Sequence, residues 1–321
     1  MKRAIIDCDP GIDDTAAILL ALSSPELDVA AVTTTYGNAS VETCTANALR
    51  ILSAAGRSDI PVFMGAGKPL LRSANEGWAS HIHGGDGMGG VAGSEGAYSR
   101  NSENDGRASD RHASLAIIEA VMAAPGELTI LALGRMTNVA LALSLEPRVA
   151  EAVREIVVMG GAVTVPGNVS GVATANLYED PEAAAIVYRS GASIAQVGLD
   201  VCNRVTVAPS QLDAIADAGS PATQLLSEAT AYLREAYIRT GRITPAEGAR
   251  YNDMPAVGYA IAPGLFASRR AFVEIETHSE LTRGQTVADW SAAEPNALIC
   301  LEVDSAALTA MFTERLCRGF A

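Results

Sequence analysis

Basic residues, paired cysteines and long apolar runs are all scarce in this chain. Lys and Arg number 23 against 37 Asp and Glu, which gives a formal net charge of −14 and a pI near 4.7. Binding to phosphate groups requires lysine and arginine, so this balance argues against nucleic acid and anionic membrane surfaces as partners. It suits a small substrate that is neutral or cationic.

The cysteines form no recognisable pattern. They are widely separated, odd in number and contain no Cys-x-x-Cys pair, which argues against a disulfide framework and a zinc site; they are Cys8, Cys44, Cys202, Cys300 and Cys317. No apolar stretch reaches the length of a membrane span, and the first residues lead into a short strand-like run where a signal peptide would have its apolar core. We therefore expect a cytoplasmic location.

Short apolar runs alternate with helix-like segments along most of the chain. Such runs, rich in β-branched residues, predict βαβ units. The expected strands are 3–7, 28–35, 60–64, 128–133, 155–159, 193–197, 271–276 and 298–303. The expected helices are 13–23, 41–56, 112–124, 137–145, 181–190, 209–217, 221–240 and 305–317. No internal repeat or linker stands out, so we expect a single α/β domain over residues 1–321, with a mostly parallel central β-sheet flanked by helices.

Residues 65–111 break this alternation. The segment is rich in Gly, Ser, Asn and charged residues, without clear periodicity, and it contains the run His81-Ile82-His83-Gly84-Gly85-Asp86. A loop of this length in a compact domain is typically functional or disordered. We expect a long mobile loop that covers a site; a plain surface insertion is the alternative.

Four aspartates fall within eight residues near the start of the chain: Asp7, Asp9, Asp13 and Asp14. An apolar run precedes them, Pro10-Gly11 interrupts them and a helix-like stretch follows. Asp13 alone could cap that helix, but capping does not need four acids. Carboxylates converge at one place only with a positive charge between them, and a divalent cation is the simplest such charge.

Oxygen ligands indicate a hard cation. Calcium accepts many carboxylate and carbonyl oxygens in loose geometry, whereas magnesium prefers few protein ligands and several waters. With so many carboxylates, we predict Ca²⁺. A further acid from far along the chain should complete the site, and Asp253, directly before a predicted helix, is the candidate.

Polar residues follow several of the predicted strands. Ligands in open parallel sheets bind beyond the carboxyl ends of the strands. There the chain places the acidic cluster, Asn38 after the second strand, Thr137-Asn138 after the strand at 128–133, and Asn168 and Asn176 beyond Met159-Gly160-Gly161. We expect these segments to line one crevice, although turn or cap roles are the alternative for Asn38 and Thr137-Asn138.

The run from Asp7 to Asp14 resembles the signature of the nucleoside hydrolase family, which cleaves the N-glycosidic bond of ribonucleosides. The resemblance extends nearly end to end through Gly37-Asn38, His81-Ile82-His83-Gly84, Thr137-Asn138, Leu145-Glu146-Pro147-Arg148, Met159-Gly160-Gly161, Asp180-Pro181-Glu182-Ala183-Ala184 and Val197-Gly198-Leu199-Asp200. It implies a single α/β domain with a Rossmann-like core, one bound calcium and a homodimer or homotetramer.

The resemblance also implies roles for individual residues. Asp9, Asp14 and Asp253 would bind calcium through their carboxylates, and Leu133 through its backbone carbonyl. Asp9 would also be the general base that takes a proton from a metal-activated water. The remaining roles concern the sugar: Asp13 and Asn38 would bind the 2′- and 3′-hydroxyls, and Met159, Asn168 and Asn176 its 5′ side.

Some positions depart from the family pattern. Asn252 stands where a histidine often protonates the leaving base, and an amide can hydrogen-bond the base but cannot act as an acid. Thr174, still predicted to bind the substrate, and Ala175 replace a glutamate and an aromatic residue, which removes one ligand for the 5′ end of the sugar and opens the pocket there. Arg135 replaces a proline or glycine. The base and 5′ preferences are therefore left open, and a 5′-modified substrate is one alternative.

Activation of the leaving group then needs other candidates. His83 matches a family histidine that faces the pocket, and a purely structural role is the alternative. Tyr232 and Tyr237 are predicted to contact the base, with Tyr251 as a further candidate. Tyr232 and Tyr237 are five residues apart and do not share a tight helical stripe, so core packing of at least one of them is the alternative. Trp78 is a further candidate for stacking on it.

Two rival interpretations remain. A magnesium-dependent phosphotransferase of the haloacid dehalogenase type would share Asp7-Cys8-Asp9, but Gly11 stands where such proteins have Thr or Val. A calcium-dependent protein that binds ribosyl compounds or nucleosides with little or no catalysis would keep the metal site and lose the leaving-group acid, as Asn252 suggests. The sequence favours the hydrolase.

Overall fold

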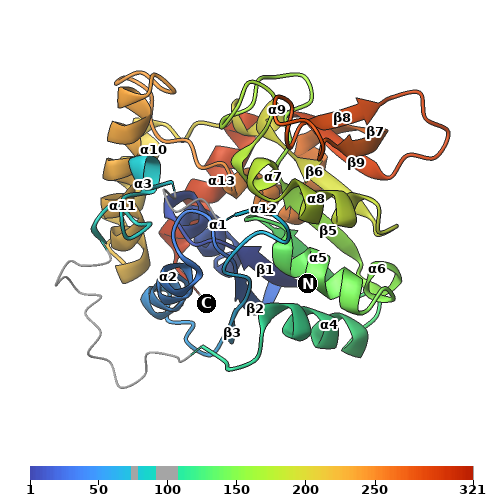
Figure 1. Cartoon of the computed structure of the whole chain (residues 1–321). Coiled ribbons are helices and arrows are strands. Elements are labelled where there is room, and N and C mark those ends of the chain that lie inside the picture. The colour runs from blue at the N-terminus through green and yellow to red at the C-terminus, as the bar shows by residue number, and fades with distance from the viewer. Residues whose placement is uncertain (74–78, 92–107, 321) are drawn as a thin grey trace.

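The computed structural model describes residues 1–73, 79–91 and 108–320. Within them the chain forms nine strands and helices that alternate along most of its length (Figure 1). The strands are β1 Lys2–Cys8, β2 Leu27–Thr34, β3 Val62–Met64, β4 Leu128–Ala132, β5 Glu155–Met159, β6 Ile194–Val197, β7 Phe266–Ile275, β8 Thr286–Asp289 and β9 Ala297–Val303. The predicted α/β class is confirmed.

The helices of the described residues are more numerous than the sequence suggests. They are α1 Ile12–Leu22, α2 Val41–Ala54, α3 Ser80–His83, α4 Ala113–Ala123, α5 Thr137–Leu145, α6 Val149–Ala152, α7 Ala175–Glu179, α8 Pro181–Tyr188, α9 Leu199–Cys202, α10 Pro209–Asp217, α11 Pro221–Arg239, α12 Met254–Ile261 and α13 Ser305–Arg318, with a 3₁₀ turn at Pro263–Leu265. Four of them, α3, α6, α7 and α9, have four or five residues, too few to show a helical period.

The strands form one sheet in the order β3-β2-β1-β4-β5-β6-β9-β7-β8. All neighbouring pairs from β3 to β9 are parallel, whereas β7 runs antiparallel to both β9 and β8. The order reverses at β1, because β2 and β3 lie on one side of it and β4 on the other. A crevice opens at such a reversal, beyond the carboxyl ends of the strands.

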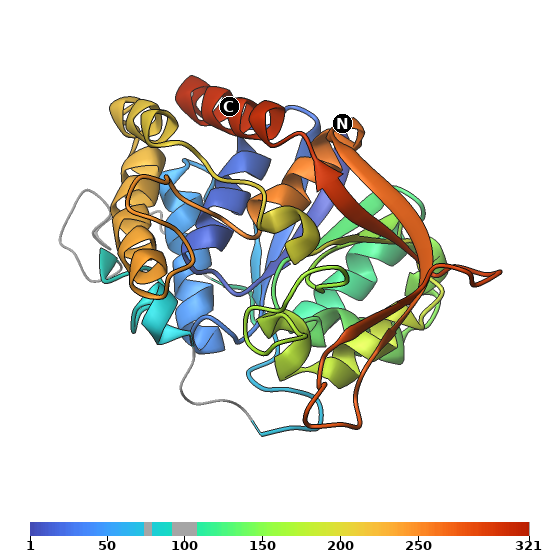
Figure 2. The ribbon, with the colours of Figure 1, turned by 90° about the horizontal axis from the view of Figure 1, so that it is seen from above.

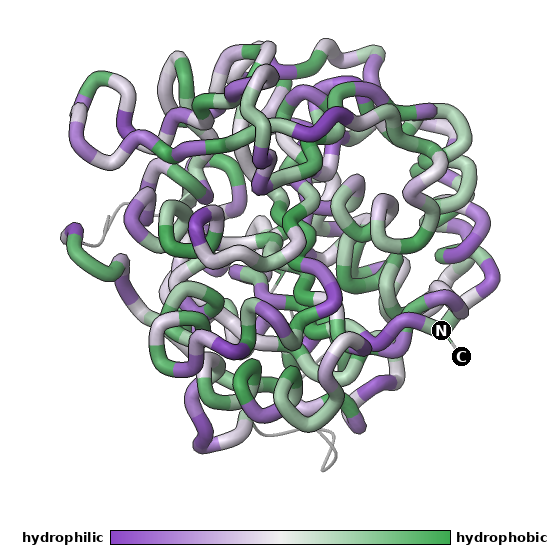
Figure 3. The backbone as a smooth tube through the Cα atoms, turned by 90° about the vertical axis from the view of Figure 1, so that its right-hand side faces the viewer, coloured by the Kyte–Doolittle hydropathy of each residue, from purple (hydrophilic) through white to green (hydrophobic). Residues whose placement is uncertain are grey.

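Alternation of side chains along the strands builds a core on each face of the sheet. In β1, Ile6 and Cys8 pack into one core and Ile5 into the other. The helices α1, α2, α11, α12 and α13 cover the first face, and α4, α5, α6 and α8 cover the second. Figure 2 shows these two groups on opposite sides of the sheet, and in Figure 3 many hydrophilic segments follow the outer loops. Two buried faces account for the near-continuous apolar runs of the central strands.

Some element boundaries differ from the sequence-based expectation. The strand expected at 271–276 begins five residues earlier, at Phe266. The sequence pattern missed this start because the added residues include the exposed and polar Ser268, Arg269 and Arg270. The strand β8 was not expected at all. The segment 65–111, predicted to be a loop, contains α3; the rest of the predicted cover, at 74–78 and 92–107, lies outside the described residues, as does Trp78.

No helix in residues 1–73, 79–91 and 108–320 combines the length and the apolar character needed to cross a bilayer.

Candidate active site

A pocket of about 320 Å³ lies at the carboxyl ends of the central strands. Segments that follow β1, β2, β4 and β5 contribute to it, together with α3, α7, α11 and the start of α12. Most residues predicted from the sequence line it: Asp9, Asp13, Asn38, His83, Leu133, Met159, Asn168, Thr174, Asn176, Tyr237, Asn252 and Asp253. The structure therefore brings together side chains that are up to 244 positions apart, as Asp9 and Asp253 are.

Three carboxylates converge at one end of this pocket. Asp13, Asp14 and Asp253 are all buried, and one oxygen from each lies within 4.8 Å of the others. Asp13 and Asp14 occupy the first turn of α1 and Asp253 directly precedes α12; these helices pack against each other, so their positive N-terminal ends face the same acids. Asp13 Oδ1 and Asp14 Oδ1 are buried without a hydrogen-bond partner among the described residues.

The pKa values of these acids reflect their crowding. Burial, and then the negative charge of Asp13, raise the pKa of Asp14 from 3.8 to about 6. Burial, followed by the charges of Asp13 and Asp14, raises the pKa of Asp253 well above its usual range. Unpartnered buried oxygens on acids that repel one another fit the ligand set of a hard divalent cation.

Asp9 stands beside this cluster. Its Oδ2 accepts a hydrogen bond of 2.8 Å from the backbone N–H of Asn38 and contacts Nη1 of Arg135. Burial raises the pKa of Asp9, and the positive charge of Arg135 opposes that rise. The predicted carbonyl ligand, Leu133 O, lines the pocket and accepts a hydrogen bond of 2.6 Å from the Asn176 amide.

Asp7, the first of the four aspartates, belongs to the core of the sheet. Its Oδ1 accepts hydrogen bonds of 2.6 Å from Thr33 Oγ1 and 2.8 Å from Asn138 Nδ2. The side chain is fully buried and does not line the pocket. Asn138, considered for the crevice, thus has a structural role that ties the start of α5 to β1 and to the end of β2.

His83 is held against the start of α1. Its Nδ1 accepts a hydrogen bond of 3.2 Å from Ile12 N–H, which places the ring proton on Nε2, 3.7 Å from Asp13 Oδ1. Burial lowers the pKa of His83 from 6.5 to about 4. The imidazole is therefore neutral at pH 7, and its remaining N–H faces Asp13.

Asn252 and Tyr237 also line the pocket. Asn252 Nδ2 donates a hydrogen bond of 3.1 Å to the Tyr237 hydroxyl, and both side chains are buried. Burial, and then the charge of Asp13, raise the pKa of Tyr237 above its usual range. Tyr232 does not line the pocket; its ring packs beside Gly89 and its hydroxyl lies 3.4 Å from Ser80 O, so it supports α3.

The predicted 5′ side is made of side chains that bond to the protein itself. Thr174 Oγ1 accepts a hydrogen bond of 3.0 Å from Gly161 N–H, and Asn168 Oδ1 accepts one of 3.0 Å from Ala175 N–H. Asn176 Nδ2 donates to Met159 O at 3.0 Å, as well as to Leu133 O. Ala175 lines the pocket at this point with only a methyl group.

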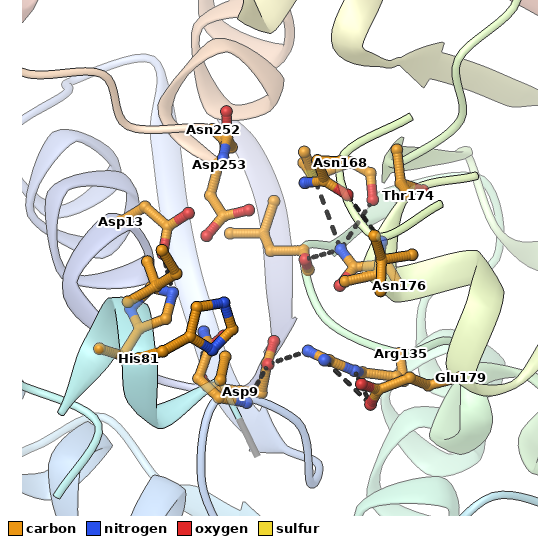
Figure 4. A pocket seen from close by; sticks show the side chains of 18 of the residues that line it. Asp9, Asp13, His81, Arg135, Asn168, Thr174, Asn176, Glu179, Asn252 and Asp253 are labelled. Carbon is orange, nitrogen blue, oxygen red and sulfur yellow. Dashed lines mark hydrogen bonds and ion pairs between the residues drawn. The ribbon is translucent and has the colours of Figure 1, made fainter. Parts of the chain in front are cut away.

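Sequence reasoning missed several residues of the pocket, namely His81, Arg135, Glu179 and Arg242. Figure 4 shows Arg135 between Asp9 and Glu179, with Asp13 and Asp253 on one side of the pocket and Asn168, Thr174 and Asn176 on another. The available signals were local: His81 lies in the run quoted above, and Arg135 departs from the family pattern. Neither signal indicates what the side chain contacts.

Comparison with known proteins identifies the family of this chain. The family model described as inosine-uridine preferring nucleoside hydrolase matches residues 4–310. An inosine-uridine preferring nucleoside hydrolase of Crithidia fasciculata is 37% identical over 295 residues, which cover 92% of this chain and 90% of that protein.

Solved structures give the same result. A plant nucleoside hydrolase superposes with a TM-score of 0.89 at 34% identity and covers 98% of this chain and 99% of its own. A purine-preferring ribonucleoside hydrolase from Gardnerella vaginalis has a TM-score of 0.89 at 31% identity, with 99% and 98% covered. Sequence motifs, fold and pocket therefore agree that this chain belongs to the family of inosine-uridine preferring nucleoside hydrolases.

Proposed function

We propose that this chain hydrolyses the N-glycosidic bond of a ribonucleoside to ribose and free base, and that it requires Ca²⁺. The observation that carries the calcium proposal is the cluster of Asp13, Asp14 and Asp253, with two buried carboxylate oxygens that lack a hydrogen-bond partner. Family membership supports the nucleosidase chemistry and argues against the phosphotransferase alternative.

The cation would be held by the predicted ligands Asp9, Asp14 and Asp253 and by the Leu133 carbonyl, beside Asp13. When bound, it would lower the pKa of a water and supply charge for the hydroxyls of the sugar. Asp9 lines the pocket next to this place, and its Oδ1 accepts no hydrogen bond from the described residues, so it can take the proton of the attacking water.

The remaining residues bind and stabilise. Asp13 and Asn38 line the pocket on the side of the cluster, where they can hold the 2′- and 3′-hydroxyls. As the bond to the base breaks, the sugar acquires oxocarbenium-like positive charge, which the surrounding carboxylates stabilise. Asn168, Asn176 and the Met159 backbone border the 5′ side. His83, Asn252 and Tyr237 remain the candidates for contact with the base.

Release of reducing sugar from a panel of purine and pyrimidine ribonucleosides tests this function. We expect ribose release in Ca²⁺, loss of release in EGTA, and recovery when Ca²⁺ is added back. Asp9→Asn should abolish turnover and keep sugar binding, whereas Asp59→Asn, which removes the same charge at an exposed site paired with Arg57, should behave as the wild type.

The binding-protein alternative rests on Asn252, which cannot protonate a leaving base. Thermal stabilisation by ribose without any release of sugar across the panel would favour it and contradict the hydrolase. The cytoplasmic location and the homodimer or homotetramer also remain predictions. Cell fractionation and light scattering of the purified protein test them.

A further inference from the structure

Arg135 is a buried cation that bridges two acids at the edge of the pocket. Its side chain is only 2% exposed. One end contacts Asp9 Oδ2 through Nη1, and the other donates to Glu179 Oε2 from Nε at 3.0 Å, with Nη2 also at 3.0 Å. Asp9 follows β1, Arg135 follows β4 and Glu179 ends α7, so only the assembled fold brings the three together (Figure 4).

The backbone around this group leaves room for it. A Cβ at Gly37 would lie 2.1 Å from Arg135 Nη1 and 2.2 Å from Asp9 Oδ2. A Cβ at Gly134 would lie 2.6 Å from Asp9 Oδ1. Any side chain at Gly37 would therefore displace the contact between Asp9 and Arg135, which shows that the contact occupies a closely fitted space.

Charge balance explains why Glu179 is needed. Burying a guanidinium costs free energy unless a negative charge neutralises it and acceptors take its N–H groups. A single acid would need both of its oxygens for this task. Because Glu179 takes two of the Arg135 nitrogens, Asp9 shares only one of its oxygens with the guanidinium. Asn38 N–H donates to that same oxygen, Oδ2, and Oδ1 receives no hydrogen bond from the described residues.

We propose that Arg135, held by Glu179, is a positioning residue that fixes Oδ2 of Asp9 and leaves Oδ1 as the one Asp9 oxygen for the cation and the attacking water. The inference rests on the proposed function for the role of Asp9. Arg135 acts through Asp9 here and need not touch the substrate. Without Arg135, the Asp9 carboxylate would rotate and spend much of its time turned away from the water.

Steady-state kinetics of ribose release from inosine and uridine test the proposal. In Arg135→Ala we expect kcat to fall by about 10- to 100-fold, the effect of a misplaced catalytic group, while KM stays within about threefold. Guanidinium chloride at about 50 mM, well below denaturing concentrations, should restore part of kcat. Arg135→Lys should have a lower kcat than the wild type, because one ammonium cannot bridge both acids.

Arg72→Ala is the matched control. Arg72 also bridges two acids, Glu182 and Glu280, but it does not line the pocket. Arg72→Ala should lower the free energy of unfolding without changing kcat. If Arg135→Ala does not fold, Glu179→Gln keeps the arginine and weakens its anchor, and a lower kcat at unchanged KM is again expected. An unchanged kcat in a folded Arg135 variant, or a rise in KM alone, would overturn the proposal.

A crystal structure with Ca²⁺ gives a readout that does not depend on turnover. We expect Asp9 Oδ2 on Arg135, and Oδ1 toward the cation, in the wild type, and a rotated Asp9 carboxylate in Arg135→Ala. A wild-type structure with Asp9 Oδ2 on the cation and Arg135 on Glu179 alone would refute the positioning role. If the wild type releases no ribose from any nucleoside, the proposed function fails, and this structure still decides the positioning role.

Discussion

The side-chain amide of Asn38 joins the two acids that flank it in the pocket: Nδ2 lies 2.9 Å from Asp14 Oδ2 and 3.0 Å from the backbone oxygen of Asp9. The backbone N–H of the same residue donates to Asp9 Oδ2. Asn38 was predicted as a sugar ligand, and the structure gives it a second task. It neutralises part of the lone-pair repulsion within a buried acidic cluster.

Replacing Asn38 by alanine should therefore destabilise the metal-free protein. Asp14 Oδ2 would keep only the N–H of Gly11, and we expect a loss of about 1–3 kcal/mol of unfolding free energy, the cost of leaving a buried acceptor short of a partner. Urea denaturation in EGTA measures it. Asn203→Ala, at an exposed position, should change stability by less than about 0.5 kcal/mol. Equal effects would remove Asn38 from this role.

The stability of the metal-free protein should fall as pH rises from about 4 to about 6, because the two acids Asp14 and Asp7 together outweigh His83, whose lowered pKa acts in the opposite direction. Burial raises the pKa of Asp14 and of Asp7 from 3.8 to about 6, so between these values the folded state holds protons that the unfolded state has released. Stability from these groups is complete below the unfolded pKa and is lost through the folded one, by up to about 3 kcal/mol for each group.

Calcium should reverse this trend, because its ligands must be deprotonated to bind it. The difference in Tm between samples with Ca²⁺ and with EGTA should grow from pH 5 to pH 7. Thermal unfolding across this range measures both effects. A metal-free stability that rises steadily with pH, with a constant effect of Ca²⁺, would contradict the assignment of these buried acids.

Asn252→His should raise the hydrolysis of nucleosides whose base needs a proton to leave. Asn252 now donates to Tyr237 and cannot protonate the base, whereas proton transfer from a positioned acid contributes roughly 10²–10⁴-fold. We expect at least about a tenfold gain in kcat with inosine. The matched substrate is 7-methylinosine, whose base leaves without protonation, and its rate should stay nearly unchanged. A similar gain with both substrates would show that the histidine acts in another way.

Loss of the 5′-hydroxyl should matter little to this chain. Thr174 Oγ1 and Asn168 Oδ1 already accept hydrogen bonds from the backbone, and Asn176 Nδ2 donates two, so only neutral groups with part of their capacity left can meet the 5′-oxygen. We expect kcat/KM for 5′-deoxyinosine to lie within about tenfold of that for inosine. The matched substrate 2′-deoxyinosine should lose about 100-fold or more, because it lacks a hydroxyl that faces the acidic cluster. Equal losses would contradict this division of the pocket.

The local sequence pattern was sufficient to predict most of the long helices and strands. The helix expected at 137–145 and the strand expected at 155–159 have the predicted bounds, since their periodicity and flanking turns are encoded within a dozen residues. The failures were short or polar: α3, α7 and β8 span four or five residues each, and the exposed start of β7 carries no alternation of apolar residues.

The sequence alone determined the α/β class and the family, and it predicted a cation held by acids, because these depend on composition, period and ordered motifs. The fold confirms the class, and the family match confirms the resemblance. Only the tertiary structure decided which acids meet. It places Asp13 beside Asp14 and Asp253, directs Asp7 into the sheet and sets Asp9 against Arg135. The physical reason is that β1 pairs with β4 and α1 packs against α12, contacts between segments more than a hundred residues apart, and no local pattern specifies which side chains such contacts bring within a few ångströms.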